Sequence, residues 1–263
     1  MIRALTLVAL LLVAVYAFAL FLRKTGMFFP DRFPTGRWDT KQWVVEPSEH
    51  WITTSDDVRL HGWLFRASDT NAPMLIWCHG NAGNLTNRAE MAAELARRGV
   101  SVFLFDWRGY GRSEGRASES ALYRDTVAAF DYVKSLKPAS IVLYGESLGG
   151  PYAAYAAKER KGQVHAVIIE NSFPSLRALG NALYKLGWMA PFAMSTTKWL
   201  NEAGVPVLVM HGTRDQVIPY ALGKQLYDGL HVPKEMLTAN VGHSEIPALE
   251  AGRYYDAVIK FAK

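Results

Sequence analysis

Two pentapeptides of this chain follow the pattern Gly-x-Ser-x-Gly. Only one of them lies between a predicted strand and a predicted helix, the setting in which this pattern is typical of a particular fold. They span Gly145–Gly149, centred on Ser147, and Gly111–Gly115, centred on Ser113. In 263 residues with 21 glycines, chance yields about 0.09 matches, so the pattern alone is only suggestive. It gains meaning between a strand and a helix, because a sharp turn there lifts the serine oxygen clear of the sheet edge.

The neighbours of Ser147 supply that setting. Ser140–Tyr144 is a short, β-branched strand pattern, and Pro151–Lys158 is an alanine-rich helix pattern. Glycines beside the serine are expected where the turn has a positive φ and where the helix packs closely on the strand. Ser113 instead lies in Asp106–Gly115, a polar, glycine-rich stretch that predicts a loop. We therefore predict Ser147 as a nucleophile and Ser113 as a loop residue.

A serine nucleophile needs a base to accept its proton and an acid to orient that base. Val205–Met210 is an apolar strand pattern, and Asp215 follows it closely as the acid candidate. Val232–Leu237 predicts a last short strand, and His243 lies in the loop behind it as the base candidate. Serine, acid and base thus occur in this order along the chain.

Other residues compete for these roles. His211 ends a predicted strand, where its imidazole is expected to make a local structural hydrogen bond. Glu170 and Asp106 also stand at the ends of apolar runs, so either side chain can point above the sheet. Asp215 is preferred because its strand lies two elements after the nucleophile, and Glu170 is the reserve.

Attack on a carbonyl also requires two N–H donors for the oxyanion that forms. One is expected from Leu148, directly after the nucleophile. The other is expected after the early strand Met74–Cys78, in the glycine-rich loop His79–Asn84, where we choose Asn81. The alternative for this loop is a tight turn with no catalytic duty.

Taken together, these motifs resemble the α/β-hydrolase superfamily, and the resemblance runs from about residue 27 to the C-terminus. The chain is most similar to a membrane-anchored subgroup that includes the bud-emergence-like proteins of fungi and plants and α/β-hydrolase-domain proteins of animals. The resemblance implies a serine ester or thioester hydrolase that acts on lipid-like acyl groups without a metal or organic cofactor. The segments that carry it are His79–Asn81, Asp106–Ser113, Gly145–Gly149, His211–Asp215 and Gly242–Ser244.

Two other functions remain open at this level. A peptidase of the serine-aminopeptidase type shares the fold and the triad, because fold does not determine substrate. A non-catalytic, membrane-tethered scaffold is the second alternative, although such a protein usually has a broken triad and none of the predicted catalytic positions is altered here.

Short β-branched runs alternate with helix patterns from about residue 51, which predicts one α/β domain over residues 27–263. We expect a mostly parallel sheet with helices on both faces. Trp51–Thr54 and Val58–Phe65 predict an antiparallel hairpin at the sheet edge. The helix patterns are Asn87–Arg98, Glu119–Leu136, Pro151–Arg160, Tyr220–Gly229 and Pro247–Ala262.

About 35 residues separate the predicted strands that end at Ile169 and begin at Val205, which is more than a crossover helix needs. The interval is rich in bulky apolar residues. We predict a small helical lid at about residues 174–203 that supplies an acyl pocket. The alternative is a plain helix that covers the sheet.

The first residues predict a membrane anchor. Ala4–Leu22 is an uncharged apolar run of 19 residues, close to the ~20 that cross a bilayer as a helix. We therefore predict residues 1–26 as a single-pass anchor whose orientation the flanking charges leave open. Because Ala17–Ala19 has the form of a cleavage site, a removed signal peptide and a secreted or periplasmic enzyme are the alternative.

Charge and cysteine content add few constraints. The net charge of +5 comes without a long basic run, which argues against a nucleic-acid partner. The expected partners are an acyl substrate and, through the anchor, a membrane; the oligomeric state is not predicted. Cys78 is the only cysteine, so the chain forms no internal disulfide, and no metal-binding motif occurs.

Overall fold

The computed structural model describes the chain in two long segments and a few isolated positions. These are residues 27–189 and 194–263, together with Thr6, Leu10, Val13 and Tyr16. Apart from those four positions, the predicted anchor lies outside the described residues and stays a prediction. Within the part that is described, no helix has the length and apolar character needed to cross a membrane.

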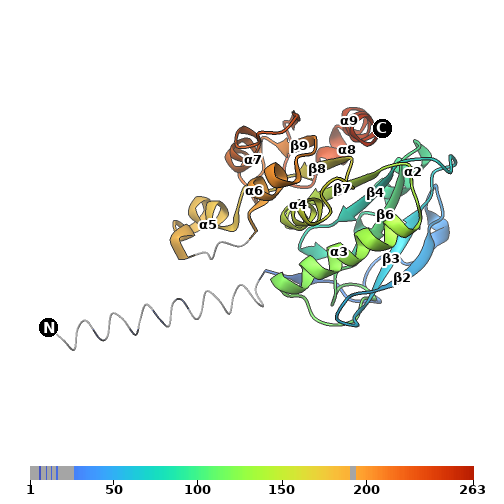
Figure 1. Ribbon diagram of the computed structural model, residues 1–263, viewed down its shortest axis with the longest axis horizontal. Helices are drawn as coiled ribbons and strands as arrows, with labels where there is room; N and C mark the ends of the chain where they lie inside the picture. Colours follow the sequence, from blue (N-terminus) through green and yellow to red (C-terminus); the bar gives the residue numbers. More distant parts are fainter. Residues whose placement is uncertain (1–5, 7–9, 11–12, 14–15, 17–26, 190–193) are drawn as a thin grey trace.

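An eight-stranded sheet runs through the centre of the domain (Figure 1). Its strands are β2 (Ser48–Thr53), β3 (Arg59–Phe65), β4 (Met74–Cys78), β6 (Ser101–Phe105), β7 (Ile141–Glu146), β8 (Ala166–Glu170), β9 (Val207–Gly212) and β10 (Lys234–Ala239). The order across the sheet is β10-β9-β8-β7-β4-β6-β3-β2. The strands from β10 to β6 are parallel, whereas β3 is antiparallel to both β6 and β2. The predicted parallel sheet with an edge hairpin is confirmed.

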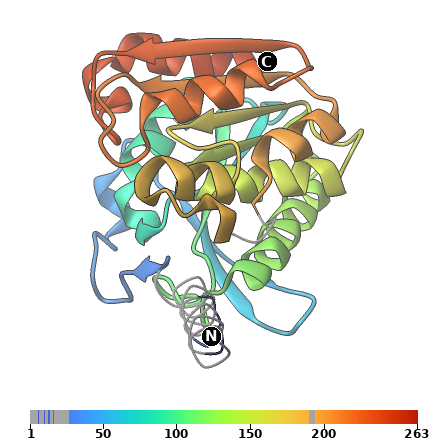
Figure 2. The same ribbon diagram turned by 90° about the vertical axis from the view of Figure 1, so that its left-hand side faces the viewer.

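A separate two-stranded sheet holds the start of the described domain against the loop after β4. Its strands are β1 (Phe29–Pro30) and β5 (Ala82–Gly83), which pair in parallel. The β1 segment therefore lies beside the loop that was predicted to carry an oxyanion donor. Figure 2 shows β1, in blue, and the helix after β8, in gold, on the same side of the molecule.

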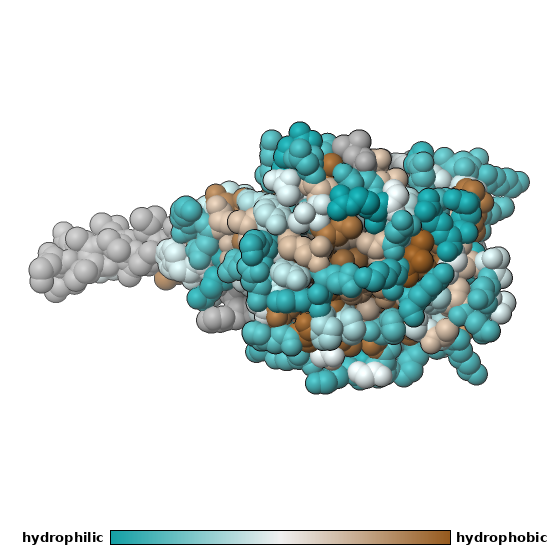
Figure 3. All heavy atoms as spheres, turned by 90° about the horizontal axis from the view of Figure 1, so that it is seen from above, coloured by the Kyte–Doolittle hydropathy of each residue, from teal (hydrophilic) through white to brown (hydrophobic). Residues whose placement is uncertain are grey.

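Helices cover both faces of the sheet, as predicted. On one face lie α2 (Ala89–Arg97) and α9 (Ala251–Ala262). On the other lie α3 (Glu119–Ser135), α4 (Gly149–Glu159), α6 (Thr196–Ala203) and α7 (Tyr220–Asp228). The remaining elements are α5 (Leu176–Tyr184), α8 (Ile246–Leu249), η1 (Thr40–Gln42), η2 (Leu85–Asn87) and η3 (Gly187–Met189). Seen from above, the surface is mainly hydrophilic, with hydrophobic side chains in small groups (Figure 3).

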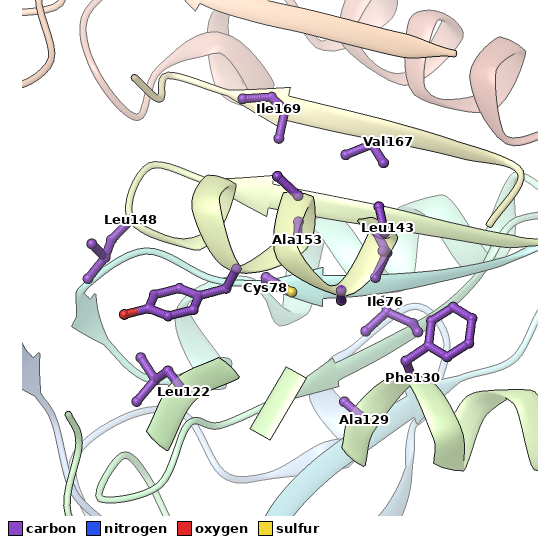
Figure 4. Close-up of a cluster of buried hydrophobic side chains, with 14 of the residues drawn as sticks. Ile76, Cys78, Leu122, Ala129, Phe130, Leu143, Leu148, Ala153, Val167 and Ile169 are labelled. Atoms are coloured by element: carbon purple, nitrogen blue, oxygen red, sulfur yellow. The ribbon is translucent and has the colours of Figure 1, made fainter. Parts of the chain in front are cut away.

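The central strands are buried on both faces, so they read as continuous apolar runs instead of alternating ones. In β4, Ile76 and Cys78 enter one core, and Leu75 and Trp77 enter the other. Figure 4 shows the first core, where Ile76 and other sheet residues meet Phe130 of α3. Because side chains on both faces of the central strands are packed into a core, these strands have fixed positions. The loops that follow them at the carboxyl edge are positioned in the same way.

The region predicted as a lid contains two kinds of helix. In α6, Leu200 is buried and the Trp199 ring lies 5.4 Å from that of Tyr155 on α4, so α6 packs on α4 as part of the helical layer. In contrast, α5 has no buried residue, and Tyr184 and Trp188 are 70% and 64% exposed. Among the coloured elements of Figure 1, α5 lies to the left of α4. The lid hypothesis thereby narrows to α5 and η3.

Candidate active site

Ser147 stands on a strained turn between β7 and α4. Its φ is +51°, in the left-handed region that non-glycine residues seldom adopt. The turn is held from behind, because Ser147 N donates to Glu170 O at 2.8 Å and Gly150 N donates to Ser147 O at 3.1 Å. The predicted sequence of strand, turn and helix is therefore present, and the turn raises the Ser147 side chain above the sheet edge.

The positive φ falls on the serine itself and not on the glycines beside it. These glycines are required by close approach alone. A Cβ on Gly145 would lie 2.6 Å from Gly150 Cα, and a Cβ on Gly149 would lie 1.9 Å from Cys78 O. Any side chain at either position would push α4 away from the sheet, which corrects one of the two reasons expected for these glycines.

Three predicted residues meet at the carboxyl edge. Ser147 Oγ lies 3.0 Å from His243 Nε2, and His243 Nδ1 lies 2.6 Å from Asp215 Oδ2. Each residue follows a different parallel strand, β7, β9 or β10, so the sheet brings the three together. A carboxylate only accepts, so Nδ1 carries the proton, and Nε2 accepts from the serine hydroxyl.

Asp215 is held as an anion by the groups around it. Its Oδ1 accepts hydrogen bonds from Val217 N and Ile218 N, both at 2.8 Å. Burial opposes ionisation of Asp215, but the hydrogen bonds from His211 and His243 outweigh it and lower the pKa of the carboxyl well below its ordinary value. The negative charge is therefore available to orient the His243 ring and to stabilise its protonated form.

His211 and Asp106, the other candidates for base and acid, make structural hydrogen bonds. His211 Nε2 donates to Ile218 O at 2.9 Å, which is the local structural hydrogen bond expected for it. The same nitrogen also lies 3.4 Å from Asp215 Oδ2. Asp106 is fully buried, and its Oδ1 accepts from Leu85 N at 2.7 Å. Neither His211 nor Asp106 is hydrogen-bonded to His243.

Glu170, the reserve acid, belongs to a buried network behind the turn. The Tyr144 hydroxyl donates to its carboxyl, and the hydroxyls of Tyr144 and Tyr254 lie 2.9 Å apart. Burial, and then the nearby charge of Glu146, raise the pKa of Glu170 to about 8. At neutral pH this carboxyl is protonated, so it is unsuited to orient a catalytic imidazole.

The loop after β4 lies directly against the turn that carries Ser147. A Cβ on Gly80 would lie 3.5 Å from Ser147 Cβ. His79 Nδ1 donates to Gly80 O at 2.7 Å, which fixes the plane of the peptide between Gly80 and Asn81. Because the N–H of a trans peptide points opposite to its carbonyl, this bond also sets the direction of the Asn81 N–H.

Both predicted oxyanion donors keep their N–H groups available. Asn81 O accepts from Phe29 N at 2.9 Å and from the Tyr110 hydroxyl at 2.8 Å, which anchors the loop from outside. In the hydrogen-bond network of residues 27–189 and 194–263, the N–H groups of Asn81 and Leu148 have no acceptor.

One charged pair beside the site escaped the sequence analysis. Arg88 binds Glu146, the residue directly before Ser147, through two hydrogen bonds of 2.9 and 2.6 Å. Burial raises the pKa of Glu146, but the charge of Arg88 and its hydrogen bonds lower it to about 2. The signal available in the sequence was a charged residue inside the Gly-x-Ser-x-Gly turn, where a buried carboxylate needs a partner. Among the described residues, no cluster of three or more His, Cys, Asp or Glu side chains is arranged to hold a metal ion.

A model described as alpha/beta hydrolase fold matches residues 73–197, from just before β4 into α6, a span that includes the Ser147 turn. The chain belongs to the α/β-hydrolase superfamily. The matched span leaves out β9, β10 and the loops that carry Asp215 and His243, so the sheet itself relates those residues to the turn.

Individual relatives extend the likeness of this α/β hydrolase along the chain. The uncharacterized protein YfhR of Salmonella typhimurium is 32% identical over 232 residues, covering 80% of this chain and 79% of that protein. The protein bem46 of Schizosaccharomyces pombe is 28% identical over 209 residues, covering 73% and 70%. The Pyrococcus furiosus esterase Pf2001 superposes with a TM-score of 0.73 at 21% identity, over 89% of this chain and 96% of that one. This last likeness is one of fold.

Proposed function

We propose that this α/β hydrolase cleaves carboxylic ester or thioester bonds of lipid-like acyl substrates through an acyl-enzyme. The observation that carries the proposal is the continuous chain of contacts from Ser147 Oγ to His243 and from His243 to Asp215, at 3.0 and 2.6 Å. Pf2001, which shares the fold, is an esterase, and this agrees with the proposal. The same chemistry needs neither a metal ion nor an organic cofactor.

The first half of the reaction acylates the serine. His243 Nε2 takes the hydroxyl proton as Ser147 Oγ bonds to the carbonyl carbon, and Asp215 stabilises the imidazolium that forms. The carbonyl oxygen becomes an anion and accepts hydrogen bonds from the N–H groups of Asn81 and Leu148. His243 then gives its proton to the departing alkoxide or thiolate, which leaves the acyl group on Ser147.

The second half returns the enzyme to its starting state. Water enters where the alcohol or thiol left, and His243 takes a proton from it as its oxygen bonds to the acyl carbon. The same two N–H groups hold the second oxyanion. When that intermediate collapses, His243 returns the proton to Ser147 Oγ and the carboxylic acid leaves.

The acyl chain is proposed to meet α5 and η3. This segment follows β8 at the carboxyl edge and exposes Leu183, Tyr184, Leu186 and Trp188, all large apolar side chains. The test is a panel of p-nitrophenyl esters whose acyl chains range in length from C4 to C16. A Trp188→Ala variant is expected to prefer a different chain length from the wild type. Trp51→Ala, an exposed tryptophan on β2, is the control. An unchanged chain-length profile in Trp188→Ala would remove the acyl-pocket role.

Residues 4–22 are proposed to tether the enzyme to a membrane. The support is their apolar length and the position of β1, whose Phe29 N donates to Asn81 O beside the site. A tether there would hold the active site close to the bilayer. Fractionation of cells that express the full chain tests this: recovery in the soluble fraction after gentle lysis would contradict it.

The decisive experiment is active-site labelling with a fluorophosphonate, followed by hydrolysis of a panel of acyl esters, acyl thioesters and peptides. Ser147→Ala should abolish both labelling and hydrolysis, whereas Ser113→Ala should retain both. Labelling that survives Ser147→Ala would overturn the nucleophile. Cleavage of aminoacyl peptides with no ester or thioester turnover would favour the peptidase alternative.

A further inference from the structure

A charged pair behind the catalytic turn joins the two segments that carry the proposed oxyanion donors. Arg88 comes directly before α2, and Glu146 ends β7 next to Ser147. Arg88 Nε donates to Glu146 Oε2 at 2.9 Å, and Nη2 donates to Oε1 at 2.6 Å. Two parallel hydrogen bonds between a guanidinium and a carboxylate fix the orientation of both groups.

The third nitrogen of the same guanidinium holds the loop after β4. Arg88 Nη1 donates to Ala82 O at 2.9 Å and lies 3.5 Å from Asn84 O. Ala82 directly follows Asn81, so the carbonyl next to the proposed donor is tied to Arg88. The planar guanidinium of Arg88 therefore bonds to the Ser147 turn through one edge and to the loop after β4 through the other.

Little room is left for either segment to move. A Cβ on Gly80 would lie 3.1 Å from Glu146 Oε1 and 3.4 Å from Arg88 Nη2, so the loop rests on the charged pair. Trp77 Nε1 also donates to Glu146 Oε2, at 3.2 Å. The side chains of Arg88 and Glu146 are only 11% and 17% exposed, so water cannot readily replace these bonds.

We propose that Arg88 is a positioning residue for the oxyanion site, which sets the distance between the loop that carries Asn81 N–H and the turn that carries Leu148 N–H. The inference rests on the proposed function. Donors stabilise an oxyanion only when they already stand where the charge develops, and a misplacement of about 1 Å can cost about 10²-fold in rate. Arg88 would thus contribute to catalysis without touching the substrate.

Arg88→Lys tests this role because lysine keeps the positive charge but lacks the planar fork. With p-nitrophenyl butyrate we expect kcat to fall about 10²-fold while KM changes less than about threefold. Arg160→Lys is the matched control: Arg160 makes the same two-point contact with Asp131, at 2.8 and 2.6 Å, between α3 and α4. Its kcat should stay within about twofold of wild type, and an equal loss in both variants would overturn the proposal.

A double variant separates positioning from folding. Arg88→Gln/Glu146→Gln removes both charges, so no unpaired ion is left buried, and the melting temperature should stay close to that of wild type. The low kcat should persist. Binding of phenylboronic acid, which forms a tetrahedral adduct with a reactive serine, should weaken by a similar factor. If the double variant regains wild-type kcat and boronate affinity together with stability, Arg88 has only a structural role.

Ser147→Ala, assayed in parallel, distinguishes failure of this inference from failure of the proposed function. Loss of activity in Ser147→Ala with full kcat in Arg88→Lys would overturn the role of Arg88 alone. Hydrolysis that survives Ser147→Ala would overturn the proposed function and the inference with it. Loss in both variants, with the KM of Arg88→Lys unchanged, is the expected result.

Discussion

The two Gly-x-Ser-x-Gly segments have the same pattern, but their serine hydroxyls have different hydrogen-bond partners. Ser113 Oγ donates to Asp106 O at 2.7 Å and accepts from His61 N at 2.9 Å, so its hydroxyl fastens a loop to β3. Ser147 Oγ bonds to His243 Nε2 from a backbone with a φ of +51°. Backbone groups thus occupy the Ser113 hydroxyl, whereas the Ser147 hydroxyl is bonded to a histidine side chain.

The glycines of the two segments differ in backbone conformation. In the loop, Gly111 and Gly115 have φ values of +46° and +79°, a backbone that other residues rarely adopt. In the turn, Gly145 and Gly149 are needed because neighbouring backbone lies within 3 Å of where a Cβ would be. A positive φ is thus a requirement of the loop glycines alone, whereas close packing is a requirement in both segments, since a Cβ on Gly111 would lie 1.9 Å from Asp106 Oδ2.

The largest expected effect contrasts the two serines directly. Ser147→Ala should lower kcat for an acyl ester by about 10⁵–10⁶-fold, because neither attack nor proton transfer can then occur as proposed. Ser113→Ala should leave kcat within about tenfold of wild type, since its hydroxyl bonds only to the loop and β3. Steady-state kinetics with p-nitrophenyl butyrate measures both. Similar losses in the two variants would erase the contrast.

The second largest expected effect is a difference in kcat between variants of the two buried aspartates, Asp215 and Asp106. Asp215→Asn removes the charge that orients and stabilises the His243 ring, so we expect kcat to fall about 10⁴-fold. Asp106→Asn keeps an oxygen that can accept the hydrogen bond from Leu85 N, so kcat should change less than about tenfold. The same assay, repeated from pH 6 to 9, measures both variants. An Asp106→Asn variant as impaired as Asp215→Asn would mean that the wrong acid has been chosen.

A protonated carboxyl behind the turn should make stability depend on pH. The pKa of Glu170 is raised to about 8, so between about pH 4.5 and 8 the folded chain holds a proton that the unfolded chain has lost. The contribution of Glu170 is fully present below about pH 4.5 and is lost as the pH rises through 8, by about 1.4 kcal/mol per pH unit within that window.

Urea unfolding at pH 6, 7 and 8 tests that dependence. Glu170→Gln cannot ionise, so its free energy of unfolding should fall less than that of wild type over this range. Glu114→Gln removes an exposed carboxylate of the Ser113 segment and should follow the wild-type slope. If Glu170→Gln also follows that slope, the carboxyl is ionised at neutral pH.

The smallest expected effect reverses the ranking of the serines, because it concerns stability and not activity. Ser113→Ala leaves His61 N–H and Asp106 C=O without their buried partner, which should lower the free energy of unfolding by about 1–3 kcal/mol. Ser147→Ala should change it by less than about 0.5 kcal/mol. Urea unfolding at pH 6 compares the two, and an equal loss would mean that Ser147 also supports the fold.

Much of the scaffold was predictable, because buried parallel strands are continuous apolar runs with clear ends. The predicted strand Met74–Cys78 agrees with β4 at both ends, and the predicted hairpin turn lies between β2 and β3. The sequence did not predict that the lid region, residues 174–203, contains two helices with different packing. Its apolar composition is shared by α5, which has no fully buried residue, and α6, which packs on α4, and composition cannot tell these two settings apart.

The pairing of Arg88 with Glu146 could not be predicted, because it joins residues 58 positions apart on a helix start and a strand end. Several arginines were equally available to a carboxylate at Glu146. Only the neighbouring positions of β4 and β7 in the sheet bring the loop after β4 onto the turn after β7. The partner of a buried charge is thus decided by strand order.

By itself the sequence determined the kind of scaffold and the choice of Ser147, because strand, turn and helix are local patterns that a few adjacent residues specify. It also named Asp215 and His243 as candidates, from their places behind successive strands. The tertiary structure alone decided the distances among these three residues, the left-handed backbone at Ser147 and the Arg88 bridge. Each of these depends on how distant strands pair and pack, and no stretch of neighbouring residues carries that information.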